Sequence, residues 1–153
     1  MTENLNLDTI QALPYVARVW ENKRIQLRPV EEAGVADEAA ANAYNPHNST
    51  GVSKLHDQGI YGKGVIVGIV DTGIAYRHPA LGGGFGSGFK VAKGYDLVGN
   101  WNGDGKNPDE DPDDQQGHGT HVAGIIAGKS AFWSGVAPEA TIYSYKVLPI
   151  REY

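Results

Sequence analysis

The sequence contains no cysteine. No disulfide and no cysteine-ligated metal site can therefore form, and cysteine usage does not indicate a redox compartment. A dense basic cluster is also missing, because the 13 lysines and arginines are scattered among 18 acidic residues and the formal net charge is −5. Nucleic-acid binders carry a concentrated positive patch, so we expect no nucleic-acid partner.

Long hydrophobic runs are missing as well. The first residues, MTENLNLDTIQALPYVARVW, have acidic and polar side chains where an export signal would have a basic patch and then an apolar run. No stretch approaches the roughly 20 apolar residues that span a bilayer. As written, the sequence predicts no export signal and no membrane partner.

What remains is the composition of a globular protein. The chain has 153 residues, of which 41% are hydrophobic, and 21 glycines that indicate many tight turns. This length predicts one domain with a sizeable core. Residues 1 to about 30 predict a small strand-rich appendage, and residues 31–50 a polar linker rich in alanine and asparagine.

From Gly51 onward the pattern changes to that of an α/β domain. Val52 and Leu55 have the spacing of a short amphipathic helix, and the β-branched run at 65–70 predicts a strand buried on both faces of a parallel sheet. Further strands are predicted at 90–99 and 141–148, and a helix from about His118 to Gly128. We therefore expect a parallel sheet with a ligand site beyond the carboxyl ends of its strands.

Two residues are expected at that site. Asp71 ends the first strand, and His118 begins the helix between Gly117 and Gly119, which allow close approach to its ring. Either residue alone fits a structural role, as a turn-capping aspartate or a satisfied core histidine. Together they fit a carboxylate that orients an imidazole base, with the aspartate preceding the histidine in the chain.

Metal binding is the alternative chemistry. Asn100, Asn102, Asp104, Gly105 and Asp111 can be laid on a calcium loop, but asparagine at the first position and two nearby prolines make the fit poor. A solvated acidic loop is the favoured interpretation. For zinc, Gly119 and Thr120 stand between His118 and His121, where the HExxH motif has its glutamate base. We expect no metal and no organic cofactor.

Three stretches, GVIVGIVDTGIAYRHPAL, GHGTHVAGIIAG and GVAPEATIYSYKVL, resemble consecutive signatures of subtilisin-like serine peptidases, the subtilases. The sequence of residues 78–100, HPALGGGFGSGFKVAKGYDLVGN, is most similar to that of fungal secreted subtilases of the minor extracellular protease type. The resemblance implies a three-layer α/β fold, a polypeptide substrate and an extracellular location. It also implies that Asp71 orients the base His118, that His121 is structural, and that the helix packs through Ala123 and Gly124.

The resemblance further implies that residues 1–48 are a propeptide tail and linker and that residues 49–153 are the N-terminal part of a catalytic domain. None of the six serines stands in the family's GTSM context; they are Ser49, Ser53, Ser87, Ser130, Ser134 and Ser144. We therefore expect the chain to stop before the nucleophile and to be inactive alone. The alternative is a non-catalytic binding or regulatory protein, or a gene-model fragment.

Overall fold

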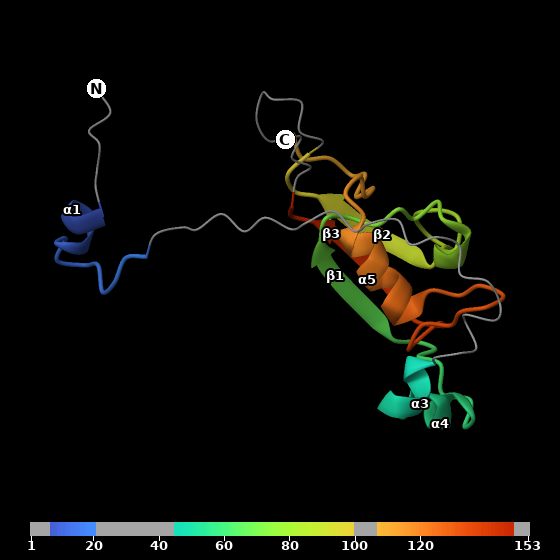
Figure 1. The fold of residues 1–153 in the computed structure, drawn as a ribbon. Coiled ribbons are helices and arrows are strands. Elements are labelled where there is room, and N and C mark those ends of the chain that lie inside the picture. The colour runs from blue at the N-terminus through green and yellow to red at the C-terminus, as the bar shows by residue number, and fades with distance from the viewer. Residues whose placement is uncertain (1–6, 21–44, 100–106, 149–153) are drawn as a thin grey trace.

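The computed structural model describes residues 7–20, 45–99 and 107–148 (Figure 1). Its centre is a three-stranded parallel sheet in the order β1-β3-β2, formed by Ile66–Asp71, Thr141–Lys146 and Val91–Asp96. The connection from β2 to β3 passes through helix α5, His118–Ala127. The predicted strands and the predicted helix are confirmed, with ends that differ by a few residues, and the parallel α/β architecture is confirmed with them.

Helix α5 covers one face of the sheet (Figure 1). It packs through three small residues four positions apart, Gly119, Ala123 and Ala127, all of which are buried. A short 3-10 helix, η1 at Pro79–Leu81, contacts α5 as well. The buried core between these elements consists of Ile69, Ile74, Tyr76, Leu81, Val91, Ala123, Ala127 and Ile142.

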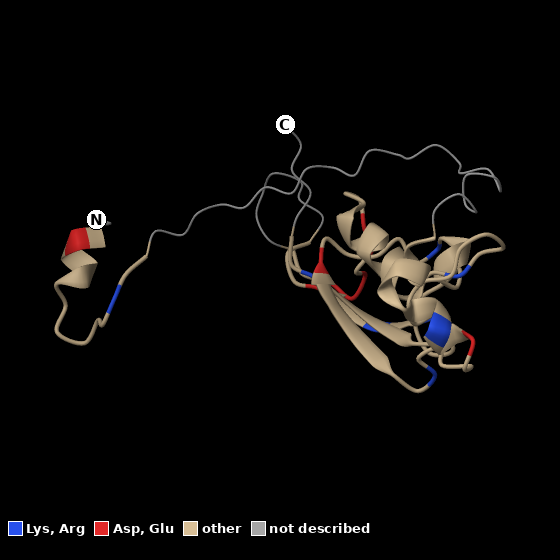
Figure 2. Ribbon diagram, turned by 60° about the horizontal axis from the view of Figure 1, so that its bottom comes forward, with Lys and Arg blue, Asp and Glu red and all other residues tan. Residues whose placement is uncertain are grey.

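The prediction that the first strand is buried on both faces is wrong for the described residues. Ile66 is 58% exposed and Val70 is 64% exposed, whereas Ile69 points into the core. The reason is that α5 covers one face only, and β1 pairs with β3 alone, at the edge of the sheet. The structure therefore shows a sheet and one helical layer, and no third layer appears among the described residues (Figure 2).

The predicted strand-rich appendage is also wrong where the structure describes it. Residues 7–20 contain the helix α1, Leu7–Gln11, and no strand. No residue of α1 is buried. Because no packing favours an extended chain here, local hydrogen bonds determine the conformation, such as the bond from Ala12 N to the Asp8 carbonyl at 3.0 Å. Residues 21–44, where most of the predicted linker falls, lie outside the described part.

The end of the predicted linker is helical. Helix α3, Pro46–Thr50, is followed by α4, Val52–His56, so the predicted short helix is confirmed, but of its two apolar residues Val52 is buried and Leu55 is 45% exposed. Proline at the first helical position and the Asn45 side chain, which accepts from His47 N at 3.0 Å, favour the start of α3. Gly51, with φ of 80°, ends it.

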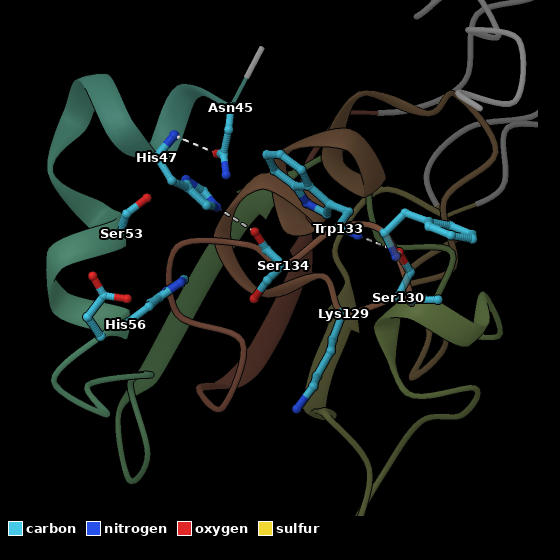
Figure 3. Close-up of a pocket in the computed structure, with 11 residues that line it drawn as sticks. Asn45, His47, Ser53, His56, Lys129, Ser130, Trp133 and Ser134 are labelled. Carbon is cyan, nitrogen blue, oxygen red and sulfur yellow. Dashed lines mark hydrogen bonds between the residues drawn. The ribbon is translucent and has the colours of Figure 1, made fainter. Parts of the chain in front are cut away.

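Two histidines hold α3 and α4 against the loop before β3. His47 Nε2 donates to the Ser134 carbonyl at 2.5 Å (Figure 3). His56 Nε2 donates to the Val136 carbonyl at 2.9 Å. The buried His47 ring also lies against Trp133, with 5.0 Å between ring centroids. Beside these contacts, a cavity of about 390 Å³ is lined by residues of the two helices and by residues 129–134.

Candidate active site

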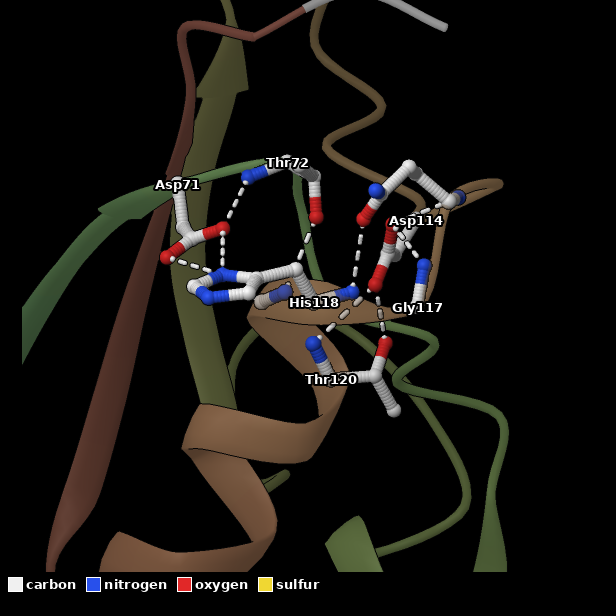
Figure 4. A network of polar contacts seen from close by, with 8 residues as sticks. Asp71, Thr72, Asp114, Gly117, His118 and Thr120 are labelled. Atoms are coloured by element: carbon white, nitrogen blue, oxygen red, sulfur yellow. Dashed lines mark hydrogen bonds and ion pairs between the residues drawn. The ribbon is translucent and has the colours of Figure 1, made fainter. Parts of the chain in front are cut away.

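The structure brings Asp71 and His118 together. Asp71 is the last residue of β1 and His118 the first of α5, and His118 Nδ1 lies 2.8 and 2.9 Å from the two carboxylate oxygens (Figure 4). The carboxylate side chain is 14% exposed and the imidazole 35%. An ionised carboxylate only accepts, so Nδ1 carries the proton, and in the neutral imidazole Nε2 presents a lone pair. None of the described residues forms a hydrogen bond with Nε2.

Backbone groups around the pair fix its geometry. Thr72 N donates to Asp71 Oδ1 at 2.7 Å, and the buried Thr72 hydroxyl accepts from Gly119 N at 2.9 Å (Figure 4). A Cβ on Gly119 would lie 2.1 Å from the Gly73 carbonyl oxygen. The amino end of α5 can thus approach the turn after β1 only because residue 119 is glycine.

The first turn of α5 has its free amides satisfied by side chains. Asp114 accepts from Gly117 N and Thr120 N, each at 3.0 Å, and from the Thr120 hydroxyl at 2.5 Å (Figure 4). Gln116 Oε1 accepts from His118 N at 2.9 Å. The first N–H groups of a helix have no acceptor within the helix. Here side chains provide the acceptors, including the Thr72 hydroxyl for Gly119 N. A carboxylate at this end also suits the helix dipole.

Part of the acidic run before α5 is bound within the fold, while Glu110 and Asp111 are exposed, as in the solvated loop that the sequence predicted. Asp111 accepts from the Tyr76 hydroxyl at 2.6 Å, Asp113 pairs with Arg77 at 3.0 Å, and Pro112 is buried. Figure 2 shows acidic positions gathered at the carboxyl edge of the sheet. The run contains helix-capping and turn-binding carboxylates, and an aspartate shortly before a predicted helix start was the signal that could have identified Asp114.

A buried ion pair at the same edge was missed by the sequence analysis. Lys146 Nζ lies 3.1 Å from Asp96 Oδ2, and the two side chains are 1% and 0% exposed. The ammonium also donates to Gln115 Oε1 at 2.8 Å and to the Asp113 carbonyl at 3.2 Å. Period-two alternation along β3 places Ile142, Ser144 and Lys146 on one face, so the pattern did indicate an inward lysine.

A family model, curated proteins and solved structures resemble part of this chain. Residues 62–152 match the model of the subtilase family. The chain belongs to the subtilase family. It is 43% identical over 99 residues to the minor extracellular protease Vpr of Bacillus subtilis, covering 64% of this chain and 12% of Vpr. It is 36% identical over 121 residues to subtilisin E of the same species, covering 78% of this chain and 28% of subtilisin E.

Among solved structures, the CspB protease of Clostridium perfringens matches with 27% identity and a TM-score of 0.50, over 68% of this chain and 26% of that one. The fold is accordingly a partial α/β subtilisin fold. The chain spans roughly an eighth to a quarter of the length of these relatives, as their covered shares of 12%, 28% and 26% show. The nearer placement with fungal enzymes stays a prediction.

Two expectations about α5 of this subtilase chain are not met. His121 is exposed and its ring has no hydrogen bond to any described residue, so the supporting contact expected of it is not found there. A Cβ on Gly124 would meet nothing within 4 Å, so the helix packs through Ala123 as expected but not through Gly124.

The described residues include little of the predicted calcium loop. Four of its five positions lie outside the described residues, namely Asn100, Asn102, Asp104 and Gly105. The fifth, Asp111, is described and accepts a hydrogen bond from the Tyr76 hydroxyl. Within residues 7–20, 45–99 and 107–148, no group of three or more histidines and carboxylates is placed to hold a metal ion. The helices in those ranges are all too short or too polar to cross a membrane.

Removing the Asp114 carboxylate is expected to loosen the start of α5. In Asp114→Ala, the amides of Gly117 and Thr120 lose their acceptor, and the free energy of unfolding should fall by about 1–2 kcal/mol. Chemical denaturation measures the change. Glu110→Ala, at an exposed position in the same run, is the matched control and should change it by less than about 0.5 kcal/mol. Equal effects in the two variants would contradict the capping role.

The phenol of Tyr76 makes a pH-dependent contribution to the free energy of unfolding. Burial, followed by the hydrogen bond to Asp111 and the charge of that carboxylate, raises the pKa of Tyr76 to about 12 from 10.0. A raised pKa in the folded state means that folding stabilises the neutral phenol, so this stability is complete below pH 10.0 and is lost as pH rises towards about 12. Tyr76→Phe should show a shallower loss of stability across that interval. An unchanged slope would contradict the assignment.

Proposed function

We propose that this chain is the N-terminal part of the catalytic domain of a subtilisin-like serine endopeptidase, and that it supplies the base and its orienting carboxylate. The observation that carries the proposal is the contact of His118 Nδ1 with both oxygens of Asp71, at 2.8 and 2.9 Å. Membership in the subtilase family supports it. In this proposal residues 49–153 belong to the catalytic domain and residues 1–48 are a propeptide tail and linker.

The chemistry follows from the tautomer. With Nδ1–H bound to Asp71, Nε2 of His118 takes the proton of a serine hydroxyl while the oxygen attacks the peptide carbonyl. Asp71 stabilises the imidazolium that forms, and Nε2 then returns the proton to the leaving amine, which leaves an acyl-enzyme for water to hydrolyse. Asp71 stays ionised throughout.

The nucleophile is proposed to lie outside this stretch of sequence. All six serines lie in the described part of the chain, and none of them forms a hydrogen bond with His118. The substrate is proposed to be a polypeptide. Secretion is proposed from the relationship to a protein named as a minor extracellular protease.

Sequencing the transcript past Tyr153 is the experiment that tests this function. A continuing reading frame should encode a serine in a GTSM context, and its product should be labelled by a fluorophosphonate probe, which reacts with an activated serine hydroxyl. His118→Ala should abolish the labelling. A stop codon directly after Tyr153, or labelling that survives His118→Ala, would contradict the proposal.

A further inference from the structure

Lys146 stands at the centre of the carboxyl edge of the sheet. In the register of the parallel strands, Asp71 on β1 is opposite Lys146 on β3, and Lys146 is opposite Asp96 on β2. Register partners project to the same face of a sheet, so these three side chains form one charged row on the face that α5 covers. The sheet thus ends in two carboxylates with one buried ammonium between them.

We propose that Lys146 is a positioning residue for His118, acting through the segment that holds the amino end of α5. The role of His118 as a base rests on the proposed function, whereas the effect of Lys146 on the position of His118 does not. The ammonium donates to Gln115 Oε1 at 2.8 Å and to the Asp113 carbonyl at 3.2 Å, and it forms an ion pair with Asp96 Oδ2 at 3.1 Å.

The link from Lys146 to His118 is short. Asp113 and Gln115, which the ammonium binds, flank Asp114, and Asp114 accepts the amides of Gly117 and Thr120 on either side of His118. By binding residues 113 and 115, Lys146 of β3 therefore also holds Asp114, whose carboxylate caps α5. Because Asp71 sits on β1 beside β3, the same lysine ties both halves of the Asp71–His118 contact to one strand.

Charge placement gives Lys146 a second effect on the pair. A buried ammonium needs a counter-charge, and carboxylates stand on both sides of it. Asp96 supplies the counter-charge, and its second oxygen accepts from Val98 N and Gly99 N at 2.8 and 2.6 Å. Both oxygens of Asp71 are then left facing the imidazole, within 2.9 Å of Nδ1.

Gln115 allows a test that does not endanger folding, because its side chain is exposed. In the ¹⁵N-labelled 153-residue chain, we compare Gln115→Leu, which removes the acceptor, with Gln115→Glu, which keeps one for the ammonium. The readouts are the exchange rates of the His118, Gly119 and Thr120 amides and the low-field resonance of the His118 Nδ1 proton. Gln58→Leu, an exposed glutamine far from the sheet edge, is the matched control.

Gln115→Leu should raise the three exchange rates by about tenfold, as expected for loss of one hydrogen bond to a charged group, and should broaden the Nδ1 proton resonance. Gln115→Glu and Gln58→Leu should stay within about twofold of the parent chain. The double variant Lys146→Met with Asp96→Leu removes both buried charges and should reproduce the Gln115→Leu result.

A rise of less than about threefold in Gln115→Leu, an equal rise in Gln115→Glu, or normal exchange in the double variant would overturn the proposal. None of these measurements needs peptide cleavage. A failed positioning role therefore leaves the fluorophosphonate result intact, and a failed protease assignment leaves the exchange result intact.

Discussion

Incubated alone with casein or a fluorogenic peptide, the 153-residue chain is expected to release product no faster than buffer. The proposed base His118 and its proposed orienting carboxylate Asp71 are in contact, but none of the chain's serines forms a hydrogen bond with His118. In subtilisin, a family relative, removing the serine alone lowers turnover by about 10⁶-fold, and residual catalysis comes from the oxyanion hole and substrate binding. The rate should therefore lie below detection.

The control for this assay is Asp71→Asn. A background hydrolysis that owes nothing to the site should be the same in the parent chain and in this variant. Cleavage above buffer that Asp71→Asn abolishes would show that the chain holds its own nucleophile. That outcome would contradict the proposal that the nucleophile is encoded elsewhere, while it would support the assignment of Asp71 and His118.

The second large effect is expected from Lys146→Met. The substitution leaves the Asp96 carboxyl group 0% exposed and without its counter-charge. Breaking a buried pair by removing one partner costs about 3–5 kcal/mol of unfolding free energy, because an uncompensated charge stays in a medium of low polarity. Urea denaturation of the chain measures the loss.

Two variants make this prediction specific. Lys93→Met changes an exposed lysine on β2 whose ammonium lies over the Tyr143 ring, and it should cost no more than about 1 kcal/mol. Lys146→Met combined with Asp96→Leu should recover most of the loss, because replacing both members of a buried pair by apolar residues is often neutral. A loss below about 1 kcal/mol in the single variant, or no recovery in the double one, would contradict the buried-pair account.

The structure also changes the interpretation of the acidic stretch before α5. As a sequence, the acidic run has the composition of a solvated loop or a poor calcium loop. In the fold, Asp111 binds Tyr76, Asp113 binds Arg77 and Asp114 caps the helix. Their negative charge serves the turn and the helix that hold Asp71 and His118 in place.

The sequence by itself determined the secondary-structure elements and the pairing of Asp71 with His118. The β-branched run before Asp71 and the small residues after His118 are local patterns, and strand and helix periodicity place both residues at element ends. Parallel strands bring such ends to one edge, so the meeting of the two side chains followed from order and pattern.

Only the tertiary structure decided which charges are buried and which apolar faces are open. Lys146 and Asp96 are 50 positions apart and pair because β3 lies between β1 and β2, which no local pattern encodes. Ile66 and Val70 read as core residues yet are exposed, because burial depends on what covers the second face of the sheet. Local preference is a property of neighbouring residues, whereas burial and charge pairing are set by contacts between distant ones.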